Sequence, residues 1–221
     1  MVKQISFLIL LFLLILSFSF AENSEEDLLR GSGYSRQEQK MLQNALDKGE
    51  EQGIDRTMLY PRIKEAKSKK VSAERLLSAL ENEIKRLVSA EIILSQSSEG
   101  KRLLKTRASW QRTANLLSWG AEKKEIQIII RACGTRPENY KQATILFVSL
   151  VSWGLDRRTA LDLTEAAAMS DLSGGDFPGI QELLVRGRGK SIPPRDLALE
   201  IIKALPEIAD FTSLRERILY E

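Results

Sequence analysis

The sequence predicts an all-α protein of stacked helical hairpins, arranged either as an irregular α-solenoid-like stack or as an orthogonal helical bundle. Apolar residues recur at helical spacing in almost every segment after position 35. Capping residues, glycine and proline interrupt these segments at short intervals, which predicts about nine or ten helices. Only residues 126–130 have the β-branched composition that is typical of a strand.

The first three helices are expected before residue 99. Ser35 followed by Glu38 is a capping-box pattern and predicts the start of the first helix. The second helix begins either after Asp55, as its cap, or at Pro61, because a proline is best tolerated in the first helical turn. Ser72 precedes the longest apolar periodic run and therefore opens the longest helix.

Each later helix is expected where a capping residue or a proline precedes another periodic run. A glycine-rich stretch at 170–179 is expected to be a loop. The expected helices cover 101–118, the surroundings of 126–130, a segment that starts at 135–137, 159–169, 180–185, a segment opened by Pro193–Pro194, and 213–219.

A short motif recurs along the chain. Ser118-Trp119-Gly120 returns as Ser152-Trp153-Gly154, 34 residues later, and Gly53 begins a fainter copy without the tryptophan. An acidic residue follows each glycine by two positions. This pattern predicts a helix that ends in a left-handed glycine, followed by a helix with an acidic cap. The period resembles that of helical-hairpin repeats, although the tetratricopeptide pattern is missing and no named family is recognised.

The same offsets after each glycine predict which residues face the core. Positions +6, +10 and +13 are apolar after Gly53 and again after Gly120, whereas the match after Gly154 is poorer. Because residues 126–130 fall within this shared pattern, we expect a helix there and not a strand. The positions concerned are Leu59, Ile63 and Ala66, then Ile126, Ile130 and Cys133, and finally Ala160, Thr164 and Ala167.

The N-terminal segment has the three parts of a secretory signal peptide. Lys3 precedes an apolar run over Ile5–Phe20, and the run ends in Ser19-Phe20-Ala21. We expect cleavage after Ala21 and export to the periplasm or the exterior. The alternative is an uncleaved anchor, but the run is shorter than the ~20 residues that span a bilayer comfortably.

The remaining chain is divided by composition and by the helix signals. We expect a flexible leader over 22–34, N-terminal helical hairpins over 35–98 and C-terminal helical hairpins over 99–221. A single continuous domain over 35–221 is the alternative, since about 190 residues can share one core.

Composition excludes several classes of function. The chain has no histidine and one cysteine, which removes histidine-dependent catalysis, histidine-containing zinc sites and internal disulfides. We therefore expect no cofactor, no metal and no catalytic residues. The net charge of +3 is too small to favour nucleic acid as a partner. Cys133 ends an apolar run and is expected to be a small buried packing residue.

One candidate site is a basic helix face. On a single helix over 101–118, Lys101, Arg102, Lys105 and Arg112 would gather opposite the apolar side. Such a face is usually just solvated, and its functional alternative is docking to phospholipid, lipopolysaccharide or an acidic protein.

Other candidates are weaker. The basic stretch 186–190 lacks the glycine spacing and the preceding strand of a nucleotide-binding loop. Trp119 and Trp153 are expected to pack between hairpins, or alternatively to line a surface that holds a peptide or a sugar. Carboxylate pairs such as Glu81 and Glu83 would be needed by a glycosidase, but charged helices carry such pairs everywhere.

These observations favour an exported, non-enzymatic interaction protein, acting as an envelope or periplasmic scaffold or adaptor with another envelope protein as its partner. The alternatives are a peripheral protein that binds an anionic lipid or glycan surface, and a carboxylate-based envelope enzyme that acts on glycans. No nucleic acid partner is expected.

Overall fold

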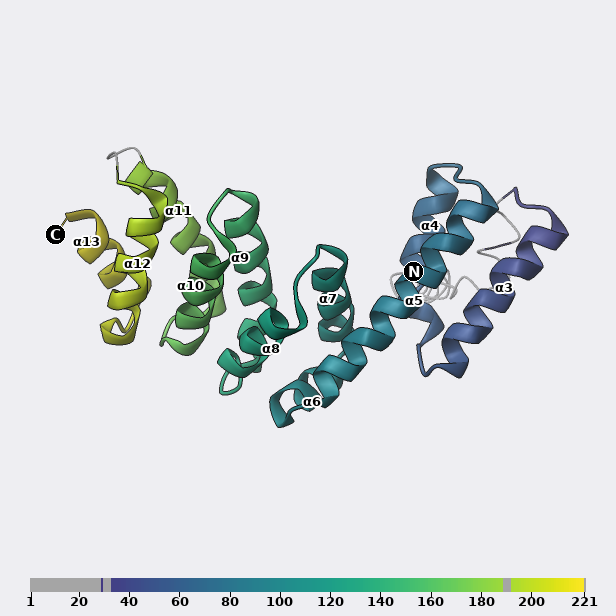
Figure 1. Cartoon of the computed structure of the whole chain (residues 1–221), viewed down its shortest axis with the longest axis horizontal. Helices are drawn as coiled ribbons and strands as arrows, with labels where there is room; N and C mark the ends of the chain where they lie inside the picture. The colour runs from purple at the N-terminus through teal and green to yellow at the C-terminus, as the bar shows by residue number, and fades with distance from the viewer. Residues whose placement is uncertain (1–28, 30–32, 189–191, 221) are drawn as a thin grey trace, which may run out of the picture. The chain divides into compact units, whose positions relative to one another are not determined.

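The described part of the protein is entirely helical. The structure, a computed structural model, describes residue 29 and residues 33–188 and 192–220. In these ranges the chain forms eleven α-helices, labelled α3 to α13, with short 3-10 helices and turns between them and no strand (Figure 1). This confirms the all-α prediction, with a helix count slightly above the expected nine or ten. The expected signal peptide and nearly all of the expected leader lie outside the described residues.

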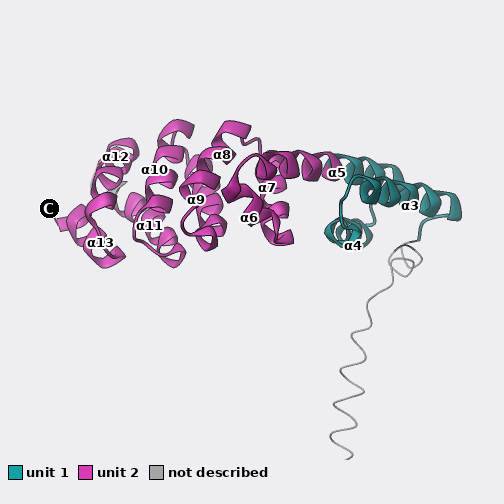
Figure 2. Cartoon of the chain, turned by 90° about the horizontal axis from the view of Figure 1, so that it is seen from below, with its two compact units in different colours: residues 1–82 teal, residues 83–221 magenta. Residues whose placement is uncertain are grey.

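The chain divides into two compact units, Met1–Asn82 and Glu83–Glu221 (Figure 2). The long helix α5 (Ala73–Ser95) runs through the division and contributes residues to both units. The domain bounds at 35–98 and 99–221 stay predictions. In the described ranges, none of the helices combines the length and the apolar character needed to cross a bilayer.

Unit 1 begins with the expected capping box. The Ser35 Oγ accepts from the Glu38 amide at 3.3 Å, and the Glu38 carboxylate accepts from the Ser35 amide at 2.7 Å, which starts α3 (Arg36–Glu51). Both expected starts of the second helix are used. Asp55 caps a 3-10 turn at Arg56–Met58, and α4 (Tyr60–Ser68) then begins with Pro61 in its first turn.

Unit 2 is a stack of helical hairpins in two layers. Consecutive helices alternate between the layers. Within a layer, each helix therefore packs on the helix that lies two further along the chain, as α8 does on α10. In Figure 2, α8, α10 and α12 form one row, and α9, α11 and α13 form the other. Layer A contains α6 (Ser98–Leu104), α8 (Lys123–Ala132), α10 (Arg157–Met169) and α12 (Pro194–Ala204). Layer B contains α7 (Arg107–Ser118), α9 (Tyr140–Ser152), α11 (Phe177–Arg188) and α13 (Phe211–Tyr220).

One expected helix is wrong, because residues 101–118 form two helices instead of one. The chain leaves α6 at Lys105, and Thr106 caps α7 by accepting from the Ser109 amide at 3.3 Å. A hydroxyl that caps the next helix competes with continuation of the previous one, so the break follows from Thr106. The ambiguous segment 126–130, in contrast, is helical as expected and forms most of α8.

The three recurring glycines all adopt the left-handed conformation. Gly53, Gly120 and Gly154 have φ angles of +81°, +91° and +102°. After each of them, the amide of the next residue donates to the carbonyl five positions earlier, at 3.0, 2.9 and 3.1 Å. This is the six-to-one hydrogen bond of a Schellman motif, which ends a helix and reverses the chain.

The shared offsets also describe the packing. All nine residues at +6, +10 and +13 after the three glycines are 5% exposed or less, including the copy whose residue types match poorly. Cys133 is one of them, at 1% exposed, which confirms its expected role as a buried packing residue. The recurring motif in the sequence therefore corresponds to one type of turn and one burial pattern, which the chain uses at Gly53, Gly120 and Gly154.

We expect Gly154→Ala to lower the free energy of unfolding by about 1–2 kcal/mol, because a left-handed backbone is costly for any residue with a Cβ. No atom lies within 4 Å of the added methyl group, so the cost is one of backbone conformation and not of crowding. Urea unfolding followed by circular dichroism measures the change. Gly175→Ala is the control, since Gly175 has no positive φ and its added Cβ meets only Ser173 Oγ, at 3.4 Å. Equal effects of the two substitutions would contradict the argument.

Candidate binding groove

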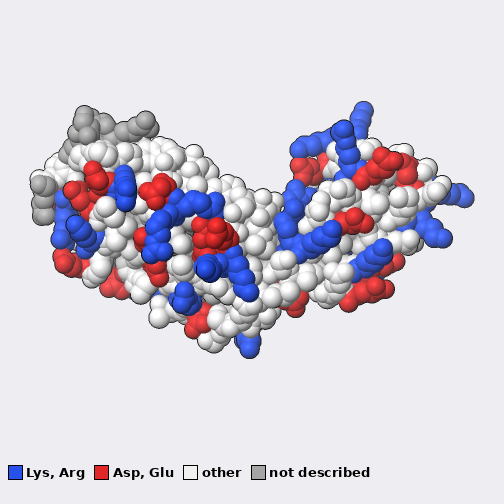
Figure 3. Space-filling model, in the orientation of Figure 1, with Lys and Arg blue, Asp and Glu red and all other residues white. Residues whose placement is uncertain are grey.

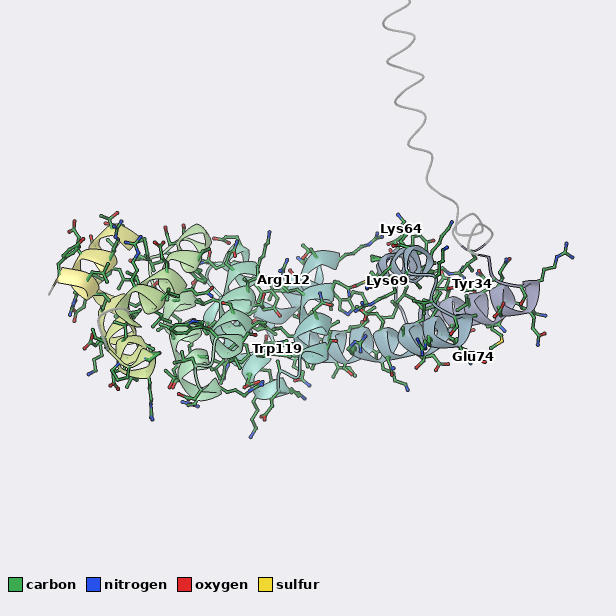
Figure 4. The ribbon with its side chains drawn as sticks, turned by 90° about the horizontal axis from the view of Figure 1, so that it is seen from above. Tyr34, Lys64, Lys69, Glu74, Arg112 and Trp119 are labelled. Carbon is green, nitrogen blue, oxygen red and sulfur yellow. The ribbon has the colours of Figure 1, made fainter. Side chains whose placement is uncertain are left out.

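A groove of about 420 Å³ lies between α7 and α9 on the outer side of layer B. Arg112, Asn115 and Trp119 line one wall, and Trp119 is the residue that caps the C-terminus of α7 (Figure 4). Buried residues of both helices close the floor. The opposite wall comes from α9 and consists of Ile145, Val148 and Ser149.

Helix α7 is held in place at its first turn. The indole of Trp110 donates to the Leu87 carbonyl of α5 at 2.7 Å, and the ring packs against the core of unit 2. The opposite side of α7 bears Arg112 and Trp119, which lie seven residues apart and therefore share one face. The wall of the groove is thus a face of a helix that is fixed from behind.

The spacing of α7 and α9 is set by a buried hydrogen bond. The hydroxyls of Thr113 and Tyr140 are 2.7 Å apart, and the two residues are 0% and 1% exposed. Burial raises the pKa of Tyr140 well above its ordinary value, so the hydroxyl stays protonated. A buried pair of this kind fixes the position of one helix along the other.

Arg157 on α10 packs against the tryptophan wall. Its guanidinium lies over the ring of Trp119 at 5.3 Å and near that of Phe147 at 5.7 Å. The same group bonds both oxygens of Glu125 on α8, at 2.8 and 2.5 Å, and the Gly120 carbonyl at 3.0 Å. One side chain of layer A therefore holds an aromatic wall of layer B.

The helices that form the groove carry positive charge alone. Helices α7 and α9 contain Arg107, Arg112 and Lys141 and no acidic residue. Within the described part of the chain, neither Arg112 nor Lys141 forms an ion pair. This contrasts with the face seen in Figure 3, where basic and acidic side chains are intermixed.

The four residues of the predicted basic face do not share a helix. Lys101 and Arg102 lie on α6, Lys105 caps it, and Arg112 lies on α7 beyond the break. Arg102 donates to the Gly134 carbonyl at 2.8 Å. Only Arg112 reaches the groove, and anionic-surface binding by the set of four stays a prediction.

The other predicted candidates fall in different places. Trp119 and Trp153 both cap helix C-termini and are partly buried against the core, as expected, but Trp119 also lines the groove. In the basic stretch, Arg186 pairs with Glu182, and residues 189–190 lie outside the described residues.

Among the described residues of unit 2, two acidic side chains are buried, and both bind an arginine. Glu83 is 1% exposed, pairs with Arg86 at 2.6 Å and accepts from the Gln111 amide at 2.5 Å. The hydrogen bond from Arg157 holds the pKa of Glu125 below its usual value. No group of three or more potential metal-ligating side chains occurs in the described ranges.

Sequence reasoning missed the groove because its walls come from two helices whose pairing is not visible in the chain. A signal was nevertheless present in α9. The apolar residues of α9 cover more than one face of the helix. Ile145 and Val148 lie at surface positions, outside the face that the buried residues of α9 form.

Comparisons with known proteins found no relative. No protein-family model matches the chain, and neither the curated proteins nor the solved structures contain a match.

We expect Glu125→Gln to lower stability at neutral pH by about 1 kcal/mol, since a charge-assisted bond to a partly exposed arginine is lost. Because the pKa of Glu125 is lowered by folding, its contribution is present above the ordinary value of 4.5 and disappears as the pH falls below it. Urea unfolding from pH 7 to pH 3 should show the variant losing less stability than the wild type. Glu182→Gln, in an exposed surface pair, is the control and should leave stability at pH 7 nearly unchanged. Parallel wild-type and Glu125→Gln curves across this range would refute the assignment.

Proposed function

We propose that the protein is an exported, non-enzymatic interaction protein, a scaffold or adaptor of the cell envelope or periplasm, and that unit 2 binds another envelope protein. The observation that carries this proposal is the groove between α7 and α9. Its volume of about 420 Å³ is large enough for one or two apolar side chains of a partner.

The groove also has the rigidity that favours binding. Its walls are held by the Thr113–Tyr140 hydrogen bond and by Arg157 behind Trp119. A site that is already formed avoids the cost of ordering side chains when a partner arrives. Stacked helical hairpins commonly use such exposed helix faces to bind other proteins.

The two alternatives have less support. A glycan-cleaving enzyme needs a carboxylic acid with a raised pKa, whereas folding lowers the pKa of Glu125 and Glu83 is paired with Arg86. A lipid-binding face over Lys101, Arg102, Lys105 and Arg112 is weakened by the break between α6 and α7.

We expect in-cell cross-linking of the full chain to yield one dominant protein partner. Its identification should be followed by purification of that partner and by measurement of 1:1 binding to the purified chain in dilute and in concentrated salt. Retention of binding in salt is expected, because apolar contacts in the groove are not screened. Recovery of the chain alone, or of a partner that fails to bind after purification, would contradict the adaptor proposal.

We also expect the exported form to begin at Glu22. The chain should be expressed with a C-terminal tag, and the N-terminus of the protein in the exported fraction should be determined by mass spectrometry. Ala21→Leu is the informative variant, because a large residue at the −1 position blocks signal cleavage and should leave an uncleaved, membrane-associated chain. Retention of residues 1–21 in the exported wild type would contradict the signal-peptide prediction.

A further inference from the structure

We infer that the occupant of the groove is a polypeptide segment that carries Asp or Glu about two helical turns away from a large apolar residue. The apolar side chain would lie between Trp119 and Val148, and the carboxylate would pair with Arg112. This inference rests on the proposed interaction function and adds the chemistry of the partner to it.

The two ends of the groove differ in charge. Arg112 precedes Thr113, Lys141 follows Tyr140, and the Thr113 and Tyr140 hydroxyls touch at 2.7 Å. Both cations therefore come from the same end of the paired helices. Trp119 lies about two helical turns further along α7.

On the side of α9, Ile145 and Val148 follow Lys141 by four and seven residues and so lie on the same face of the helix. The groove consequently has a cationic end and an apolar end. A segment with an acidic residue about two helical turns from an apolar residue matches both ends at once.

The positive charge at the cationic end is not compensated by a carboxylate of the described residues. Because α7 and α9 carry no acid, the guanidinium of Arg112 lacks a carboxylate in the described structure. Arginine binds carboxylates through two parallel hydrogen bonds, and a partly buried pair of this kind adds specificity to an apolar contact. A basic segment would be repelled at the same place, which selects against it.

The number of cations and the shape of the groove favour a peptide over a lipid surface. Membrane recognition by charge typically needs a cluster of about four to eight basic residues. Among the described residues, Arg112 is the one cation that lines the groove, and Lys141 lies one helical turn before Ile145 on α9. The apolar surface is also partly recessed, since the groove lies between α7 and α9 and the ring of Trp119 is partly buried against the core. These features suit a single inserted side chain.

A second hollow extends the surface. A cavity of about 50 Å³ between α9 and α11 shares Ile145 and Ser149 with the groove and is also lined by Phe177 and Pro178. Ile145 thus stands as a ridge between two apolar depressions. A segment longer than one side chain can contact both of them.

The test is a selection of random 12-residue peptides, displayed on phage, for binding to the purified full chain. Peptides that bind should combine Asp or Glu with Leu, Phe or Trp. Synthetic copies are then titrated by fluorescence anisotropy. We expect Arg112→Glu and Ile145→Ser each to weaken binding about tenfold or more.

Matched controls on layer A separate a local effect from a general one. Lys203→Glu and Leu199→Ser change an exposed cation and a 41% exposed leucine on α12. These variants should bind as the wild type does. A charge-reversed peptide, with Lys in place of its acidic residue, should recover affinity for Arg112→Glu, which a misfolded variant would not show.

Several outcomes would overturn the inference. One is that the selected peptides lack acidic residues, and another is that Arg112→Glu and Ile145→Ser bind them with unchanged affinity. A third concerns residues 22–29 of this chain, where acidic residues precede two leucines. It is that a synthetic copy of this segment binds the groove more tightly than the selected peptides and displaces them. A further one is Arg112-dependent sedimentation with phosphatidylcholine–phosphatidylglycerol vesicles in the absence of peptide binding. If the partner found by cross-linking binds wild type and Arg112→Glu equally, the adaptor function stands and only the assignment of the groove fails.

Discussion

The left-handed glycine turn is the constraint on which the hairpins depend. At Gly53, Gly120 and Gly154 the backbone reverses through a conformation that other residues adopt only at a cost, and the following amide closes a six-to-one hydrogen bond. Because the turn has the same geometry each time, the next helix leaves it in a similar way and buries the same positions. In unit 2, Gly120 joins α7 to α8 and Gly154 joins α9 to α10, so two successive connections from layer B to layer A follow one local rule.

Arg157 connects this local rule to the candidate site. It stands three residues after Gly154, yet its guanidinium contacts Trp119, Glu125 and the Gly120 carbonyl of the preceding copy of the turn. The side chain therefore ties neighbouring hairpins together at the place where the groove is formed. A change in the packing of α10 on α8 would be transmitted to the aromatic wall, although α10 itself does not line the groove.

Most of the fold was predictable, because its determinants lie within a few residues of each other. The capping box at Ser35, the glycine turns and the burial pattern around 126–130 are local, and they predicted helices, their ends and their inward faces correctly. The break at Thr106 was missed because the apolar period continues across it and the competing cap is a single hydroxyl. The groove was missed for a different reason: it exists only where α7 and α9 lie side by side, and Arg112 was assigned to a face on the wrong helix.

The burial of Cys133 has a practical consequence. Its thiol is 1% exposed, burial raises its pKa to about 12, and the sequence has no other cysteine. Only the thiolate reacts with alkylating reagents, so the native chain is almost inert toward maleimides at neutral pH. A cysteine introduced at an exposed position such as Asn115 could therefore be labelled selectively with a fluorophore or a spin label, without first replacing Cys133. Because Asn115 lines the groove, the label would report spectroscopically whether the groove is occupied.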